Sequence, residues 1–463
     1  MNSARSVRNL VILIAFPVSV WLAIAPPAGL DAMQGQTAGV VLVTLVLWST
    51  GIVPPFLVSL IFFALVLIAG IATPDLVFGG FSSAAVWLIV SGAVIGSAIG
   101  TSGLGKRLAA NLAPLLAGSY ARLLIGLTLA GMALAFVMPS SIGRAVVLFP
   151  VGLALADRAG FAKGSKGRIG VAVTLAAACN MPGFAILPSN IPNMILSGAA
   201  ETIHDVSFGY TQYLALHFPV LGILKSAVAV ALALVLFPDR VREASAPATA
   251  GEEVLADRAT QGRVAAILLA TLALWMTDSL HGINPAWIGM AAAVVLMLPR
   301  IGAVDPKSFN GSVDFGSVLF VAAALALGAL VNVTGLGTIL GEELTRVLPL
   351  APGHDFINFV SLSVMSAATG LVTTVAGVPT VLTPLASGLA ESSGFSVPAV
   401  LMIQVIGFST AVFPYQVAPL IVAMQLSGEK LGSVLRLTLP LALVTLFALV
   451  PVDFLWWKLL GWI

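Results

Sequence analysis

Two short polar segments interrupt long apolar runs of this sequence, and both contain groups that can bind an anion. The first, Met138–Arg144, has adjacent serines and an arginine, and the second, Thr373–Thr380, has threonines and a glycine. Hydroxyl groups and free backbone N–H groups at the start of a helix attract negative charge, because the helix dipole is positive there. Each hydroxyl has a plainer alternative role as a helix cap. The candidate substrate-binding residues are Ser140, Ser141, Arg144, Asn193, Thr373, Thr374 and Thr380.

Two further apolar runs are broken by prolines that lie next to amide side chains. Asn180–Gly183 and Pro188–Asn193 break the first run, and Pro414–Pro419 breaks the second. Proline frees backbone carbonyl groups inside a helix, and within a membrane these carbonyls need polar partners, ions or substrate. Polar residues at the breaks are therefore candidate ion-binding residues, namely Asn180, Ser189, Asn190 and Gln416.

Arg144 is the most unusual of these residues. It lies in the first turn of an expected helix, where the dipole disfavours a cation, and burial at membrane depth adds a further cost. One interpretation is a fixed cation that holds an anionic substrate through a bidentate guanidinium contact. The alternative is an arginine that caps carbonyl groups or reaches the membrane interface. Lys225, inside another apolar run, is expected to reach the interface with its long stem.

The composition indicates a membrane protein. Of 463 residues, 59% are hydrophobic and 9% are charged, which leaves too little polar surface for a soluble protein. The apolar runs predict an all-α polytopic membrane protein with about 11 transmembrane helices, two of them interrupted. Runs 123–157 and 356–391 each break into halves of about 15 residues, too short to span a bilayer. We interpret them as two re-entrant hairpins, with pairs of full spans as the alternative.

One phrase of the sequence occurs twice. Thr101–Leu108 and Val333–Leu340 both contain Gly-Leu-Gly after a long apolar run. A duplicated half in a polytopic protein is typical of secondary transporters, so we predict two inverted repeats. The predicted parts are N-terminal scaffold helices in 1–80, a first repeat in 81–237 with an inward-opening hairpin at 123–157, a cytoplasmic linker in 238–263, and a second half in 264–463 with an outward-opening hairpin at 356–391.

Basic residues are distributed asymmetrically along the chain. With the N-terminus in the cytoplasm and no crossing counted for a hairpin, most of the 21 lysines and arginines lie on the cytoplasmic side, as the positive-inside rule requires. This arrangement places the C-terminus in the periplasm and predicts an integral protein of a bacterial inner membrane. The expected partners are a small anionic substrate and the lipid bilayer, and not a nucleic acid.

Other classes of protein need residues that this chain lacks. The single cysteine, Cys179, and four histidines without ligand spacing indicate no metal site. An intramembrane enzyme needs a Ser/His dyad, paired aspartates or a His–Glu metal motif at membrane depth, and the sequence contains none of these. No cofactor is expected other than Na⁺ or H⁺ as a coupling ion. A channel stays open as an alternative to a carrier.

The chain resembles the divalent-anion/sodium symporter family, the dicarboxylate and sulfate carriers of the wider ion-transporter superfamily. The family's Gly-Leu phrase matches Ser102–Leu104 and Thr334–Leu336. Its Arg-(x)3-Leu-Pro phrase is matched closely by Arg436–Pro440, where two residues separate the arginine from Leu-Pro. Its hairpin motif Ser-Asn-Thr falls on Ser140–Ile142 and Thr374–Ala376, where only the first hydroxyl is kept. Its Thr-Pro-Pro-Asn phrase falls on the segments 190–193, which keeps Pro-Asn, and 417–420, which keeps one proline.

This resemblance implies a secondary transporter with an elevator-like alternating-access mechanism, usually a homodimer, with sodium ions near the hairpin tips. Both tips of this chain depart from the family motif, and Arg144 appears beside the first one. A fixed guanidinium can replace a bound cation electrostatically, so we expect weak or absent sodium dependence. The predicted cargo is a small anion, either a dicarboxylate or a sulfonate- or sulfate-type anion. A carrier of an inorganic oxyanion and an ion/proton antiporter of the same superfamily are the alternatives.

Overall fold

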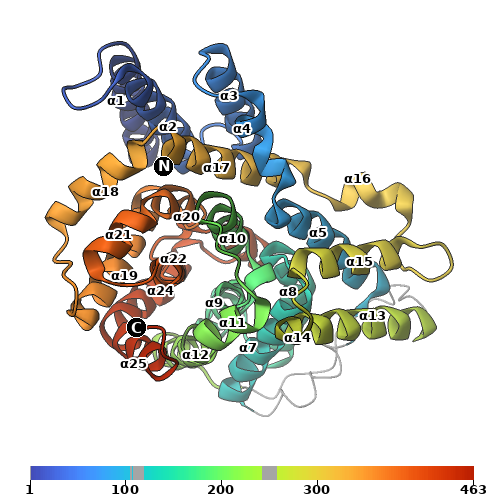
Figure 1. Cartoon of the computed structure of the whole chain (residues 1–463). Helices are drawn as coiled ribbons and strands as arrows, with labels where there is room; N and C mark the ends of the chain where they lie inside the picture. Colours follow the sequence, from blue (N-terminus) through green and yellow to red (C-terminus); the bar gives the residue numbers. More distant parts are fainter. Residues whose placement is uncertain (1, 105–106, 108–118, 242–257) are drawn as a thin grey trace.

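A computed structural model describes residues 2–104, 107, 119–241 and 258–463, and within these residues all regular secondary structure is helical (Figure 1). The apolar composition explains this, because in a bilayer each backbone N–H and C=O group must find its partner within its own helix. The all-α prediction is therefore confirmed. The predicted linker 238–263 lies mostly outside the described residues.

The first half of the chain contains a series of spans, a hairpin and a broken helix. The spans that come first are α1 (Asn2–Ile24), α2 (Ala32–Thr50), α3 (Pro55–Ile68), the short α4 (Pro74–Phe78) and α5 (Ala84–Ser102). The hairpin consists of α7 (Tyr120–Val137) and α8 (Ser141–Arg158), and the broken helix consists of α9 (Lys166–Asn180) and α10 (Ile191–His204). The last span joins α11 (Tyr210–His217) to α12 (Lys225–Leu236) through a π-helical segment, η4 (Phe218–Leu224).

The second half repeats this order of elements. It begins with α13 (Arg258–Met276), α14 (Asp278–His281), α15 (Pro285–Met297), α16 (Phe309–Ser312), α17 (Phe315–Val333) and α18 (Leu336–Val347). The hairpin consists of α19 (Asp355–Val372), α20 (Gly377–Leu382) and α21 (Ala386–Ser393), and the broken helix of α22 (Val397–Phe408) and α23 (Ala418–Ser427). The last span joins α24 (Gly432–Val444) to α25 (Val450–Leu459) through a second π-helical segment, η8 (Thr445–Leu449).

The helices form two groups in space. Figure 1 shows α1–α5, α13, α15 and α17 as an outer arm, and α7–α12 with α19–α25 as a compact bundle. Both halves of the chain build the arm, because α3 packs against α17 and α15 packs against α5. The bundle meets the arm where α10 and α20 pack against α17.

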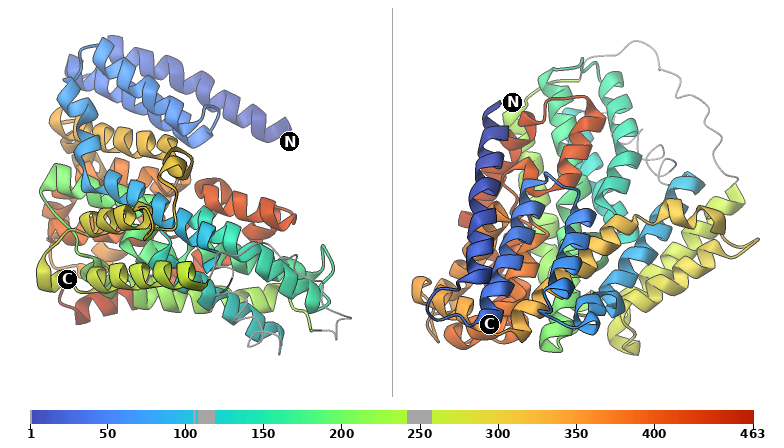
Figure 2. Two further views of the ribbon diagram at one scale, coloured as in Figure 1. Left: turned by 90° about the vertical axis from the view of Figure 1, so that its right-hand side faces the viewer. Right: turned by 90° about the horizontal axis from the view of Figure 1, so that it is seen from above.

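Within the bundle, the two hairpins have their open ends at opposite ends of the helices. Next to the open end of the first hairpin, the Gly164 N–H donates a hydrogen bond to the Glu429 carboxylate (3.0 Å). From that end α9 and α10 cross the bundle to His204, whose Nε2 hydrogen-bonds the Thr383 carbonyl of the second hairpin (2.7 Å). The chain termini also lie at opposite ends of the helices in both views of Figure 2. Equivalent elements of the two halves thus run in inverted directions, as the repeat predicts.

The duplicated phrase ends two equivalent helices. Gly103 follows α5 and Gly335 follows α17, with φ angles of +68° and +73°. Glycine adopts this left-handed conformation without the steric cost that other residues meet, and it commonly ends helices in this way. The two copies therefore perform the same local task, which supports the duplication seen in the sequence.

Nine of the described helical stretches are long and apolar enough to cross a membrane, and α3 and α15 are shorter apolar helices. The stretches 210–236 and 432–459 run straight through their π-helical segments. The first limbs of the hairpins, α7 and α19, are also long enough to span at 18 residues each. Their tips nevertheless contact the breaks between α9 and α10 and between α22 and α23, as described below. This position is the one expected of a re-entrant hairpin, so the predicted fold class is confirmed.

Candidate anion and ion site

The candidate site is built around α9, the most deeply buried of the apolar spans. In its stretch Lys166–Ala185, 89% of the most apolar window lies inside the protein. Glycines on the neighbouring hairpin permit this packing: a Cβ on Gly131 would meet the Ala178 carbonyl oxygen at 2.8 Å, and one on Gly152 would meet Leu175 at 2.4 Å. Small residues let membrane helices approach closely. They bring α7 and α8, and with them the first hairpin tip, against the end of α9.

The Arg144 side chain is completely buried and joins this tip to the break in the next helix. Its exposed fraction is 0%. A guanidinium has five N–H groups, and each of them finds an acceptor here. The acceptors are the Met138 carbonyl (2.5 Å), the Ser141 hydroxyl (2.9 Å), the Cys179 carbonyl (2.7 Å), the Ser189 hydroxyl (2.8 Å) and the side-chain oxygen of Asn190 (3.2 Å).

These contacts explain how a cation is tolerated in the first turn of α8. The backbone of Arg144 lies near the positive end of the α8 dipole, but its side chain carries the guanidinium to the C-terminal end of α9. The dipole is negative there, and the last carbonyl groups of the helix lack partners within it. None of the ion pairs in the described residues includes Arg144. Its positive charge is therefore not neutralised by any carboxylate of the described residues.

The geometry supports the second of the two interpretations of Arg144, a cap on carbonyl groups. All five N–H groups are occupied by the protein, so none is free for a bidentate contact with an anion in this conformation. The charge still acts on its surroundings, because electrostatic interactions weaken slowly with distance in a medium of low dielectric constant. Arg144 is thus a fixed cation at the junction of a hairpin tip and a broken helix.

Other side chains satisfy the remaining carbonyl groups that the break exposes. A buried backbone carbonyl needs a hydrogen-bond partner. Within the break, the Gly183 carbonyl accepts from the Ile186 N–H (3.2 Å) and the Ile186 carbonyl from the Ser189 N–H (2.9 Å), and side chains supply further donors. The donors are Asn190 Nδ2 for the Asn180 carbonyl (3.2 Å), Asn193 Nδ2 for the Gly183 (2.9 Å) and Ile186 (2.8 Å) carbonyls, and the Tyr213 hydroxyl for the Phe184 carbonyl (2.9 Å). The predicted residues of the break therefore hold its backbone in place.

Two amide atoms near the break have no hydrogen-bond partner among the described residues. They are Nδ2 of Asn180 and Oδ1 of Asn193, and both side chains are buried. Leaving a buried amide atom unpaired is unfavourable, so such atoms point to a ligand. Asn180 offers a donor that suits an anion, and Asn193 offers an acceptor. Within the described parts of the chain, no three His, Cys, Asp or Glu side chains are placed to hold a metal ion.

The two serines of the first tip have different tasks. Ser140 caps α8, because its hydroxyl accepts a hydrogen bond from the Gly143 N–H (3.1 Å). Ser141 donates to Oδ1 of Asn190 (2.5 Å) while it accepts from Arg144, and it thereby becomes part of the guanidinium cluster. The structure therefore brings Ser141, Arg144, Asn190 and Ser189 together, and leaves Ser140 at the edge of this cluster.

Gln416 performs the corresponding task at the second tip, without a charge. Its Nε2 donates to the Gly370 carbonyl (2.8 Å), and its Oε1 accepts from the N–H groups of Val412 (2.8 Å) and Phe413 (2.7 Å). The Gln416 carbonyl in turn accepts from the N–H of Val375 in the tip (3.2 Å). One neutral amide thus links the tip of the second hairpin to the second break.

The predicted threonines of the second tip mostly bond to their own helices. The Thr373 hydroxyl donates to the Thr369 carbonyl (2.9 Å), and the Thr380 hydroxyl donates to the Ala376 carbonyl (3.4 Å). Thr374 is half-buried at the tip itself. The structure therefore does not join these threonines into a hydrogen-bonded cluster like the one at the first tip, although α10 packs against α20 between the two tips.

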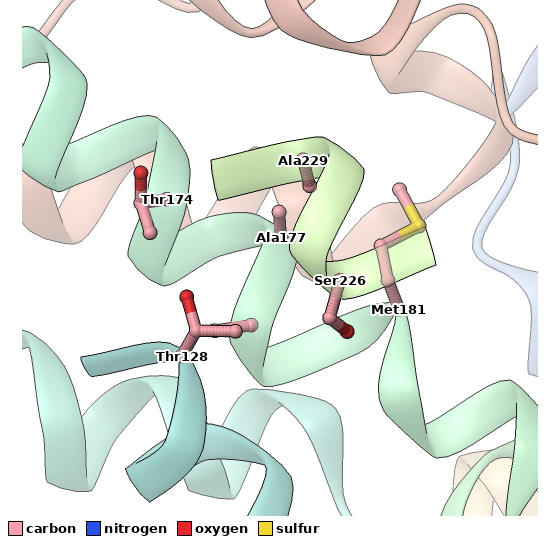
Figure 3. A pocket seen from close by; sticks show the side chains of 7 residues that line it. Thr128, Thr174, Ala177, Met181, Ser226 and Ala229 are labelled. Carbon is pink, nitrogen blue, oxygen red and sulfur yellow. The ribbon is translucent and has the colours of Figure 1, made fainter. Parts of the chain in front are cut away.

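A small cavity lies on the other side of α9, between α7, α9 and α12 (Figure 3). Its volume is about 10 Å³, which suits one water molecule and excludes a polyatomic anion. None of the predicted site residues lines this cavity, so it is not the substrate site in this conformation. The lining residues are Thr128, Thr174, Ala177, Ala178, Met181, Ser226 and Ala229.

Lys225 is a second buried cation whose role the sequence did not reveal. It begins α12, its exposed fraction is 1%, and its Nζ donates to the carbonyl (2.8 Å) and the hydroxyl (3.1 Å) of Ser409. Ser409 is the residue that ends α22, so Lys225 caps the second broken helix and does not reach the membrane interface as expected. Both helices that stop inside the bundle, α9 and α22, therefore have a side-chain cation at their C-terminal end.

Comparison with known proteins agrees with this architecture. The family described as the sodium:sulfate symporter transmembrane region matches residues 4–463. The chain belongs to this symporter family. A protein of Cupriavidus necator named only as a membrane protein is 22% identical over 465 residues, which cover 98% of this symporter-family chain and 88% of that protein.

Two solved transporter structures resemble this member of the sodium:sulfate symporter family. The YdaH transporter of Alcanivorax borkumensis has a TM-score of 0.54 and 17% identity, over 84% of this chain and 88% of that one. MtrF of Neisseria gonorrhoeae, described with a class of antimetabolite efflux pumps, has a TM-score of 0.55 and 13% identity, over 95% and 97%. At these identities the likeness concerns the fold alone. The family shows that the protein is a membrane transporter and not an enzyme.

Proposed function

We propose that this symporter-family protein is a secondary transporter that moves a small anion, either a dicarboxylate or a sulfate- or sulfonate-type anion, across the bacterial inner membrane. The observation that carries the proposal is the buried guanidinium of Arg144, which forms no ion pair with any described residue and lies where a hairpin tip meets a broken helix. A buried charge without a counter-ion is unfavourable, and an anion bound nearby relieves this cost.

Polar groups around the first tip supply direct contacts for such an anion. Nδ2 of Asn180 is a buried donor without a partner in the part of the chain that the structure describes. The helices α8 and α10 begin at the tip and at the break, after their N-cap residues Ser140 and Asn190. The N-terminal ends of helices attract anions through their free N–H groups and their dipoles. Arg144 donates no hydrogen bond to the substrate. Its positive charge attracts the anion from within the protein, behind the two helix ends.

The two groups of helices suit an elevator-like mechanism of alternating access. Within the bundle, Arg144, Gln416 and Lys225 bind the tips and breaks together through buried hydrogen bonds. The arm meets α10 and the second hairpin through apolar residues of α17, with Leu325 against Gly198 and Gly328 against Ile203 and Pro384. At α11 the bundle is hydrogen-bonded to the arm, because the Thr211 hydroxyl donates to the Met276 carbonyl of α13 (3.1 Å). A bundle whose tips and breaks are bonded to one another can move as one body relative to α17. The homodimer that the family resemblance implies is retained as a prediction.

We further propose that Arg144 replaces a sodium ion at the first tip. The carbonyl groups of Met138 and Cys179, which a bound cation would use as ligands, are already occupied by the guanidinium. A side-chain cation cannot leave during the transport cycle, whereas a sodium ion enters and leaves with the substrate. Transport should therefore proceed without sodium, as proton-coupled transport, exchange or facilitated movement.

Uptake of radiolabelled succinate and sulfate into proteoliposomes tests this function. We expect Arg144→Gln to abolish uptake and Arg144→Lys to keep part of it, because lysine retains the charge but not the planar fork. Arg346→Gln is the matched control, since Arg346 is exposed and its ion pair with Glu343 contributes little, typically about 0–1 kcal/mol. Unlabelled anion inside the vesicles should accelerate uptake by a carrier and not by a channel. Uptake at the wild-type rate by folded Arg144→Gln protein would contradict the proposal.

A further inference from the structure

A buried acid lies in the electrostatic neighbourhood of Lys225, on the last span of the chain. Asp453 belongs to α25, its exposed fraction is 0%, and neither of its carboxylate oxygens has a hydrogen-bond partner among the described residues. The span that carries Lys225 packs against the span that carries Asp453, with α12 on α24 and η4 on η8, so that the two charges act on each other. Since Nζ of Lys225 already donates twice to Ser409, the ammonium is held in place by the protein while the carboxylate is not.

An unbonded carboxylate in the interior of a membrane protein is a group that binds protons readily. Burial disfavours the ionised form, and among the described side chains only the Trp457 indole N–H is placed to donate to it, without forming a well-aligned hydrogen bond. The positive charge of Lys225 stabilises the ionised Asp453 carboxylate, which burial otherwise disfavours strongly. The pair can therefore occupy two states that differ by one proton. In one state the carboxylate is ionised and the ammonium balances its charge, and in the other state the carboxylate is protonated and neutral.

The surroundings of Asp453 favour a proton over a metal cation. A metal ion next to the carboxylate would be repelled by the ammonium of Lys225. The Trp457 indole on α25 is the nearest donor to the carboxylate. His217 at the end of α11, whose Nδ1 has no described partner, packs on the Trp457 ring. From α19, the Phe359 ring packs on Trp457 and contributes no titratable group. A site with one carboxylate, one ammonium and aromatic walls offers a metal ion few oxygen ligands.

Both groups follow irregular helical segments. The π-helical segment η4 ends at Leu224, directly before Lys225, and η8 ends at Leu449, four residues before Asp453. Single π-helical turns inside α-helices are rare and often lie at functional sites. They occur here at corresponding places in the two halves of the chain, within the long apolar stretches 210–236 and 432–459.

The same cluster connects the two broken helices. Lys225 donates to Ser409 at the end of α22. On the other side, the Tyr213 hydroxyl donates to the Phe184 carbonyl in the first break, and the Tyr213 ring packs against His217, which packs against Trp457. A change of charge at this cluster thus reaches both breaks through buried contacts.

We propose that Lys225 and Asp453 form the proton-binding site that couples transport to a proton gradient. A proton from water on one side of the membrane forms an O–H bond with the Asp453 carboxylate while Lys225 stays an ammonium group, so the charge of the pair rises from 0 to +1. On the other side the O–H bond breaks and the proton returns to water. By linkage, a bound anion and a bound proton then favour each other. This inference rests on the proposed function, because it names the coupling ion of the same transporter.

Infrared spectroscopy tests the site without any substrate. Purified wild-type protein, titrated from acid to alkaline pH, should lose the carbonyl-stretch band of a buried carboxylic acid, and Asp453→Asn protein should lack that band. Lys225→Met should shift the loss of the band to higher pH, because the ammonium no longer favours the carboxylate. Absence of a wild-type band that Asp453→Asn removes would show a permanently ionised Asp453 and would overturn the proposal.

Uptake of succinate and sulfate under a pH gradient tests the coupling, with the membrane potential clamped at zero. For one coupled proton, each unit of outside acidity should raise accumulation of the transported probe by up to about tenfold. Lys225→Met/Asp453→Leu should regain part of the thermal stability that each single variant loses, because no unpaired charge remains while Ser409 still lacks its donor, and it should lose the response to the gradient. Lys458→Met/Asp355→Asn, which removes the exposed pair at 3.9 Å, is the control that keeps the response.

The outcomes separate this inference from the function on which it rests. Succinate or sulfate uptake that ignores the pH gradient, or a double variant that still responds to it, would overturn the proton site and leave anion transport intact. Failure to take up either probe would instead count against the proposed function, and the infrared titration would then decide on the proton site by itself.

Discussion

A methyl group at position 183 should disturb the Arg144 cluster without changing any charge. Gly183 lies in a 3₁₀ turn, Pro182–Ala185, and its φ angle is not positive, so alanine adopts this backbone without strain. A Cβ at this position would lie 2.6 Å from Nη2 of Arg144, 2.8 Å from Oγ of Ser189 and 3.0 Å from Nδ2 of Asn190. These separations are too short for non-bonded atoms, so the guanidinium must move.

The expected loss of stability follows from two contributions. Overpacking a tightly packed interior costs about 1–3 kcal/mol, and weakening a hydrogen bond from a charged donor such as Nη2 of Arg144 adds about 1.5–3 kcal/mol. Partial relaxation reduces the sum, so we expect Gly183→Ala to lower the free energy of unfolding by about 2–4 kcal/mol. Gly388→Ala is the matched control: a Cβ there meets no atom within 4 Å, and alanine in a helix is favoured by about 0.5–1 kcal/mol.

Chemical denaturation in detergent measures these free energies, and anion uptake into proteoliposomes measures the effect on the site. A double-mutant cycle with Arg144→Gln tests the mechanism, because the shorter glutamine leaves room for the methyl group. We expect a coupling energy of about 0.5–3 kcal/mol between the two positions. Additive effects would refute the argument that Gly183 acts through Arg144. Wild-type stability and uptake in Gly183→Ala would refute the placement of the guanidinium.

Three further predictions concern the cap, the second tip and the topology. Ser140→Ala should lower the free energy of unfolding by about 1 kcal/mol, as expected for the loss of a helix cap. Chemical denaturation measures this loss, and a much larger loss would contradict a capping role alone. Gln416→Leu should abolish anion uptake, because it leaves the buried Gly370 carbonyl without its donor and the part-buried N–H groups of Val412 and Phe413 without an acceptor, and uptake at the wild-type rate would contradict this. An impermeant maleimide should label Ala162→Cys only from the cytoplasm and His354→Cys only from the periplasm, and the opposite pattern would overturn the assigned orientation.

The features that could be predicted from the sequence are those with local causes. Proline and glycine end helices by their own backbone geometry, so the breaks near Pro182 and Pro414 and the ends of α5 and α17 could be placed without knowledge of the packing. The apolar runs likewise fix the all-helical fold, because a bilayer leaves no other solution for the backbone. The position of Arg144 in the first turn of a helix marked it as unusual for the same local reason.

The contacts that give these residues their roles depend on packing between distant segments. The acceptors of Arg144 come from the tip, from the end of α9 and from positions 189 and 190, which lie 45 and 46 residues away. Lys225 meets Ser409 across 184 residues, so no local pattern could indicate that contact. The sequence therefore indicates that Arg144 has a structural or functional role. It does not indicate that all of its N–H groups donate hydrogen bonds to the protein itself.

The dependence of uptake on sodium tests the central claim most directly, namely that the Arg144 guanidinium stands in for a bound sodium ion at the first tip. Initial rates of succinate and sulfate uptake into proteoliposomes can be measured while sodium is replaced by choline at constant ionic strength. The transported anion should enter at the same rate at every sodium concentration in the wild-type protein. A steep, cooperative rise of the wild-type rate with sodium would contradict the claim and would require sodium sites built from other backbone carbonyl groups.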